Sequence, residues 1–178
     1  MREFHPAARL RGIQKSPIRQ LFDRAPAFSI NLGLGEPDLP TPEVIRQAAA
    51  RIVAEEQNGY TSHAGILALR ELIAADYPKL KSTADDVVVT AGSQEALYLA
   101  LMTLVDEGDE VLLPDPGFVA YPTIVRMAGG TPVYYRLPAD QDFAFDAEEF
   151  RCKLSAKTKA VICISPSNPT GARSPKMI

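Results

Sequence analysis

The chain has 178 residues, of which 46% are hydrophobic, so it is long enough to bury the core of an ordinary domain. Its formal net charge of -3 provides no basic surface for nucleic acid. No apolar run approaches the length of a membrane-spanning helix, and the N-terminal residues lack the apolar segment of a secretory signal, so we expect neither a nucleic-acid nor a membrane partner.

The two cysteines, Cys152 and Cys163, lie in neither a CxxC motif nor a Cys/His cluster. The plain interpretation is a pair of buried thiols in a reducing compartment, which predicts a cytoplasmic protein without a cysteine metal site.

The first half of the chain predicts helices separated by loops rich in glycine and proline. The basic N-terminal arm should carry a short helix over 18–23. A second helix should begin at Thr41-Pro42, as N-cap and first helical residue, and end at Asn58-Gly59. A third helix over 66–77 is stopped by Pro78.

The central stretch, VVVTAGSQEALYLALMTLV at 87–105, predicts a strand, a glycine turn and a helix. The valines at 87–89 are typical of a buried strand, and the helix from Gln94 is apolar on nearly every face, so we expect it to be interior. Unpaired N–H groups at its start, with the positive end of the helix dipole behind them and the Ser93 hydroxyl beside them, favour an anion such as phosphate. The alternative interpretation is that the glycine and Ser93 only turn the chain and cap the helix, without binding a ligand.

Strands and helices alternate from residue 87 onward, which predicts a three-layer α/β/α fold around a mainly parallel sheet. Asp146 and Glu149 have the spacing of a capping box at a helix start. Ligands of such folds bind beyond the carboxyl ends of the strands. The loops AGSQ, PDPGF and SPSNPTG should therefore converge there. The further strands are expected at 111–113, 132–137 and 160–164, and the helices at 118–128 and 146–154.

Two residues in these loops suit a flat, polar ligand. Phe118 can lie against a ring, although a core phenylalanine at a helix start is equally compatible with its position. Asn168, held between prolines, can donate to and accept from a ligand hydroxyl, although it can equally form an Asx turn. A phosphate cup, a flat aromatic and a fixed amide together match pyridoxal phosphate.

Five motifs occur in the order seen in class I/II aminotransferases, and from Ile18 onward the chain resembles that family of fold type I pyridoxal-phosphate enzymes. The motifs are LGLGEPDLPTP, GYTSHAG with LRELIA, AGSQEAL, PDPGFVAYP and SPSNPTG. The resemblance implies pyridoxal 5'-phosphate as cofactor and transfer of an amino group between an L-amino acid and a 2-oxo acid. It also implies an N-terminal arm and small-domain segment over 1–42, and an incomplete large domain over 43–178.

The resemblance assigns roles to seven residues and implies a homodimer. The cofactor phosphate would be bound by Gly92, Ser93 and Gln94, and by Tyr60 of the neighbouring subunit. Phe118 would stack on the pyridine ring. Asn168 would bind the ring hydroxyl oxygen and lie near the substrate carboxylate, and Gly35 would lie against the substrate.

The resemblance also implies that this chain alone is inactive. Family members are about twice as long, and their later half supplies the Schiff-base lysine, the aspartate at the pyridine nitrogen and an arginine for the substrate carboxylate. None of Lys153, Lys157, Lys159 and Lys176 lies in a matching motif, so we assign no catalytic residue. Two alternatives stay open: a fold type I lyase or synthase, and a non-catalytic binding module.

Overall fold

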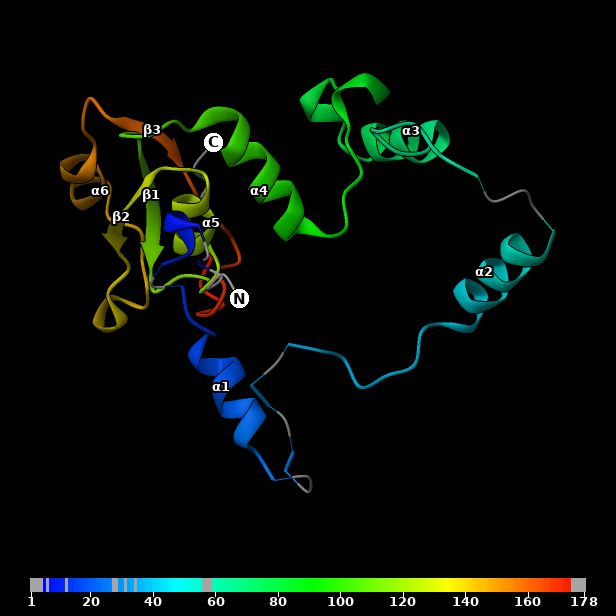
Figure 1. The fold of residues 1–178 in the computed structure, drawn as a ribbon, viewed down its shortest axis with the longest axis horizontal. Coiled ribbons are helices and arrows are strands. Elements are labelled where there is room, and N and C mark those ends of the chain that lie inside the picture. Colours follow the sequence, from blue (N-terminus) through cyan, green and yellow to red (C-terminus); the bar gives the residue numbers. More distant parts are fainter. Residues whose placement is uncertain are drawn as a thin grey trace. The chain divides into compact units, whose positions relative to one another are not determined.

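The structure is a computed structural model that describes residues 5, 7–11, 13–26, 29–30, 32–33, 35–55 and 59–173 (Figure 1). The chain divides into two compact units, one of Met1–Ala25 with Ser93–Ile178 and one of Pro26–Gly92. The expected domain division at residue 42 concerns the whole protein and stays a prediction.

The first unit is built on a parallel three-stranded sheet of order β2-β1-β3. Its strands are β1 (Glu110–Asp115), β2 (Thr131–Arg136) and β3 (Thr158–Val161). Each strand overlaps its predicted range, so the parallel sheet is confirmed. The helices are α4 (Ser93–Leu104), α5 (Tyr121–Met127) and α6 (Ala147–Lys153).

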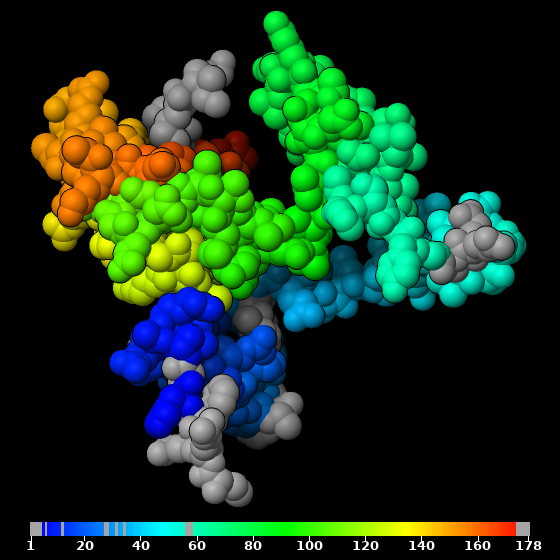
Figure 2. Space-filling model, turned by 45° about the horizontal axis from the view of Figure 1, so that its top comes forward, coloured from blue at the N-terminus to red at the C-terminus, as the bar shows by residue number. Residues whose placement is uncertain are grey.

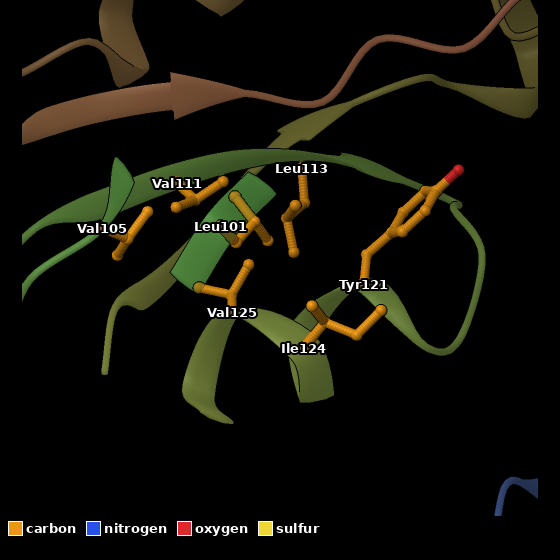
Figure 3. Packing of buried hydrophobic residues seen from close by; sticks show 7 residues of the cluster. All are labelled: Leu101, Val105, Val111, Leu113, Tyr121, Ile124 and Val125. Carbon is orange, nitrogen blue, oxygen red and sulfur yellow. The ribbon is translucent and has the colours of Figure 1, made fainter. Parts of the chain in front are cut away.

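The central strand β1 buries side chains on both faces of the sheet because successive residues of a strand point to opposite sides. On one face, Val111 and Leu113 pack against α4 and α5 (Figure 3). On the other face, Leu112 packs with Tyr135 and with aromatic residues of α6 and the loop before it. The predicted α/β/α layering is confirmed. The first cluster is completed by Leu101, Val105, Tyr121, Ile124 and Val125.

The start of α6 only half follows the predicted capping box. Asp146 accepts hydrogen bonds from the backbone N–H groups of Glu148 (2.8 Å) and Glu149 (3.4 Å), as an N-cap should. The Glu149 carboxylate does not return to the cap. It accepts a hydrogen bond instead from the backbone N–H of Arg136 in β2, at 3.1 Å.

The predicted helices of the N-terminal half are present as α1 (Pro17–Arg24), α2 (Glu43–Glu55) and α3 (Leu67–Asp76). Ser16 caps α1 by accepting from the Arg19 N–H. The Pro42 carbonyl accepts from the Arg46 N–H, so Pro42 lies in the cap position that the sequence assigned to Thr41. Asn58, in the predicted end of α2, lies outside the described residues.

The second unit packs α3 against a 3₁₀ turn at Ala84–Asp86. Arg70 of α3 donates to the Ala84 carbonyl at 2.7 Å. Thr83 caps this turn, and the hydrogen bonds that Asp86 accepts from Thr83 lower the pKa of its carboxyl. These contacts fix the segment that leads into residues 87–92.

Two expectations about residues 87–105 are wrong. The valines at 87–89 form no strand, because a strand requires a ladder partner and none of these residues pairs with a strand of the described residues. Their backbone bonds run instead from the Val87 N–H to the Ala84 carbonyl and from the Val89 N–H to the Ala64 carbonyl. The helix α4 is not interior. Leu101 is its one buried residue, whereas Leu99, Met102 and Leu104 are exposed, and Figure 2 shows α4 in green on the surface.

The expectation of buried cysteines is also wrong, since Cys152 and Cys163 are both exposed and form no disulfide. Cys152 lies in the short helix α6, and Cys163 lies just after β3. Within the described residues, the helices are too short or too polar for any of them to span a bilayer.

Candidate functional site

Two of the three motif loops lie at one edge of the sheet. β1 and β3 are parallel neighbours, so their carboxyl ends meet at the same edge. The loop that carries Phe118 leaves β1, and the loop that carries Asn168 leaves β3. This placement confirms the topology on which a ligand site at the strand ends depends.

The loop after β1 folds back tightly on the strand it leaves. A Cβ atom on Gly117 would lie 2.4 Å from the Pro114 carbonyl oxygen and 3.0 Å from Pro114 Cγ, so only glycine fits. The Phe118 carbonyl then accepts from the Tyr121 N–H at 3.1 Å, which begins α5. The turn therefore fixes the direction in which the Phe118 ring leaves the backbone.

The Phe118 ring lies partly in the core and partly at a pocket, so its position is compatible both with a core residue and with a residue that lies against a ligand. It is half-buried, packs on the α4–α5 side of the core, and meets the Tyr121 ring edge-to-face at 5.5 Å. Its remaining surface borders a pocket of about 90 Å³ at the end of β1, lined also by Asp115 and Tyr134. Burial raises the pKa of Tyr121, whose hydroxyl points away from the core cluster (Figure 3).

The loop after β3 closes on itself. The Ser167 N–H donates to the Ala172 carbonyl at 2.8 Å, and the Gly171 N–H donates to the Ser167 carbonyl at 2.7 Å, with Gly171 at φ +70°. Asn168 lies at the tip of this loop and is exposed. Among the described residues its side-chain amide has no hydrogen-bond partner, so the Asx turn does not form and the amide is available to a ligand.

Ser167 is a buried residue of this loop that the sequence did not single out. It is 8% exposed, and its hydroxyl has no hydrogen-bond partner within the part of the chain that the structure describes. Burying a hydroxyl without a hydrogen-bond partner costs free energy of folding, so we expect the Ser167 hydroxyl to have a polar contact. Nothing in the spacing of SPSNPTG distinguishes an inward serine from an outward one.

The turn before α4 has the geometry that the glycine predicted. Gly92 has φ +91°, a conformation that side chains with a Cβ rarely adopt. Thr90, which the sequence did not suggest, holds the turn by accepting from the Gly92 N–H at 2.8 Å and donating its hydroxyl to the Gly92 carbonyl at 2.9 Å. Ser93 and Gln94 then open the exposed first turn of α4, with its N–H groups directed outward.

The next turn of α4 packs on the same core cluster as Phe118, through Leu97 and Tyr98. This links the start of α4 to the first unit. That Ser93, Phe118 and Asn168 surround one molecule stays a prediction.

Gly35 and Tyr60 belong to the second unit. A Cβ on Gly35 would meet nothing within 4 Å, and Tyr60 is fully exposed. Both are thus accessible, and their roles stay predictions.

Lys157 and Lys159 lie at the opposite end of the sheet from this edge. The Lys157 carbonyl accepts from the Glu110 N–H at the start of β1, and Lys159 lies in β3 close by. At about 3.3 Å per residue, the two ends of β1 are roughly 15 Å apart. Lys153 lies in α6, 3.7 Å from the Glu149 carboxylate, and Lys176 is outside the described residues.

The fold is that of an α/β protein in which two of the motif loops follow the carboxyl ends of neighbouring parallel strands. The sequence profile described as "Aminotransferase class I and II" matches residues 29–176, and the chain belongs to this family.

The most similar proteins include named aspartate aminotransferases. The probable aspartate aminotransferase of Methanocaldococcus jannaschii is 42% identical over 93% of this chain and 44% of its own length. The aspartate aminotransferase of Pyrococcus horikoshii is 40% identical over 96% of this chain and 45% of its own. The structure of Thermus thermophilus aspartate aminotransferase with maleate matches with a TM-score of 0.90 and 34% identity, over 99% of this chain and 48% of that one. This chain therefore spans about half the length of the relatives it matches.

Proposed function

We propose that the whole protein is a pyridoxal-phosphate-dependent aminotransferase that moves an amino group between an L-amino acid and a 2-oxo acid. The observation that carries the proposal is that the loops with Phe118 and Asn168 follow the ends of neighbouring parallel strands, in a chain of the aminotransferase family. Because two of the similar proteins are named as aspartate aminotransferases, aspartate is the first amino donor to test.

The start of α4 fits the cofactor phosphate. The outward N–H groups of the first turn and the Ser93 hydroxyl supply hydrogen bonds, and the helix dipole favours a dianion there. The positive φ of Gly92 turns the chain so that its backbone can approach the phosphate without a side chain between them. Gln94 adds a side-chain amide at the same turn.

The loops after β1 and β3 fit the cofactor ring. The half-exposed Phe118 presents an apolar surface for stacking, which contributes roughly 0.5–1.5 kcal/mol beyond burial for aromatic pairs. The Asn168 amide donates to the ring oxygen and stabilises its anionic form. Its position also allows it to orient the substrate carboxylate, with Gly35 leaving space for the substrate.

The bound cofactor supplies the electron sink that amino-group transfer requires. The residues of this chain hold and orient it: Ser93 and Gln94 at the phosphate, Phe118 at one face of the ring and Asn168 at the ring oxygen. We propose a homodimer in which the fully exposed Tyr60 of each subunit donates to the phosphate held by the other. The two cysteines, which form no disulfide, support a reducing compartment, and we propose the cytoplasm.

The function is tested on the full reading frame that contains this chain. Purified protein with pyridoxal phosphate should convert L-aspartate and 2-oxoglutarate to oxaloacetate and glutamate, which a coupled dehydrogenase assay follows. The 178-residue chain alone is expected to give no turnover, because none of its lysines lies in a motif that matches the Schiff-base segment of the family. Elimination or condensation products in place of the new amino acid would contradict the aminotransferase assignment.

Replacing Ser93 by alanine is expected to weaken binding of pyridoxal phosphate by about 10- to 150-fold, because a hydrogen bond to a charged group contributes roughly 1.5–3 kcal/mol. The affinity should be measured by absorbance titration of the apoprotein. Pyridoxal, which lacks the phosphate, is the control ligand, and its affinity should not change. An equal loss for both ligands would show that Ser93 does not serve the phosphate.

A further inference from the structure

A proline interrupts the hydrogen-bond ladder between the two strands that carry the site. In a parallel pair, one residue bonds to the positions before and after its partner. The Ile162 N–H donates to the Leu112 carbonyl at 2.9 Å, so the Ile162 carbonyl faces position 114 of β1. Position 114 is proline, which has no N–H to donate. The central strand therefore cannot complete its last bond to the chain leaving β3.

The hydroxyl of Tyr135 supplies the missing donor. Tyr135 lies in β2, on the far side of β1 from β3, and its hydroxyl donates to the Ile162 carbonyl at 2.9 Å. The side chain must cross the face of β1 to reach this carbonyl. It thereby ties all three strands together where β1 and β3 end.

The tyrosine is held rigidly in this position. It is 4% exposed, and its ring meets those of Phe145 and Phe150 edge-to-face at 6.0 and 5.4 Å. Burial, together with the Cys163 thiol beside it, raises the pKa of Tyr135, so the hydroxyl keeps its proton at neutral pH and can donate.

We propose that Tyr135 is a positioning residue, whose hydroxyl replaces the N–H that Pro114 lacks and so holds the Asn168 loop against the Phe118 loop. Ile162 is six residues before Asn168, and Pro114 is four residues before Phe118. The loss of this hydroxyl leaves the part-buried Ile162 carbonyl without a donor, so that the Ile162 N–H alone bonds the chain leaving β3 to β1 at this position. The expected effect of Tyr135 on cofactor binding rests on the proposed function, whereas its role in holding the strand ends together does not depend on that function.

The test compares Tyr135→Phe with the unchanged protein, using the full reading frame. Hydrogen exchange of the apoprotein should show amides of 162–172 exchanging about fivefold faster in the variant. The affinity for pyridoxal phosphate should fall by a similar factor, since net hydrogen bonds of this kind contribute about 1 kcal/mol. If the unchanged protein binds no pyridoxal phosphate, the proposed function fails, and the exchange measurement still decides the role of Tyr135.

A rescue separates the hydrogen bond from simple packing. Pro114→Ala restores an N–H opposite the Ile162 carbonyl, so in that background Tyr135→Phe should change loop exchange and affinity by less than about twofold. Phe145→Leu, in the same aromatic cluster, is the packing control. It should lower the thermal midpoint while leaving the exchange of 162–172 close to that of the unchanged protein. Unchanged exchange in Tyr135→Phe, no rescue, or an equal effect of Phe145→Leu would each overturn the proposal.

Discussion

Replacing Gly117 by alanine is expected to weaken the binding of pyridoxal phosphate about 30-fold. The new Cβ would lie 2.4 Å from the Pro114 carbonyl oxygen, which is backbone and cannot move aside without opening the turn. Opening the turn displaces the Phe118 ring, and a strained backbone of this kind costs about 2 kcal/mol, which corresponds to the stated factor. Absorbance titration of the apoprotein with the cofactor measures the change.

The matched control is Gly108→Ala, at the opposite end of β1. Gly108 has φ +97° but open space around its Cβ position, so alanine there strains the backbone without touching the Phe118 loop. It should lower the thermal midpoint and leave cofactor affinity unchanged. If Gly117→Ala binds the cofactor as well as the unchanged protein does, the Phe118 ring is not part of the site.

Replacing Leu112 by alanine is expected to lower the free energy of unfolding by about 2–5 kcal/mol. Leu112 is 0% exposed in the central strand and forms the second core cluster with Tyr135 and Leu137. The smaller side chain leaves a cavity that the paired strands on both sides cannot close. Urea unfolding followed by circular dichroism gives the change from the shift of the midpoint.

Leu154→Ala provides the comparison for this prediction. Leu154 follows α6 and is 46% exposed, so its truncation removes little buried surface and should cost less than about 1 kcal/mol. Equal losses for the two variants would mean that the second cluster is not a core of the folded protein.

Local signals predicted the helices and the three strands well. Asp146 begins α6 as its N-cap and Pro78 follows the end of α3, so both helix boundaries depend on residues close in the sequence. The strand ranges and the site edge followed from short apolar runs and from the alternation of elements. Gly92 and Gly171 have the positive φ that such loops need.

The errors arose where the outcome depends on residues distant in the sequence. The valines at 87–89 have the β-branched side chains of a strand, but a ladder partner decides whether one forms. The exposure of α4 depends on which elements pack beside it. Tyr135 has a role only through the register that sets Pro114 opposite Ile162, and register is not visible in the composition of either strand.

The outer edge of β2 offers few N–H donors to another strand. With Leu137 donating inward to Asp115, the residues of β2 that face outward are Pro132, Tyr134 and Arg136. Proline has no N–H, and the Arg136 N–H is already bonded to the Glu149 carboxylate, so a single donor remains. This side of the sheet therefore offers an incoming strand carbonyl acceptors but only the Tyr134 N–H as donor, which disfavours intermolecular pairing there.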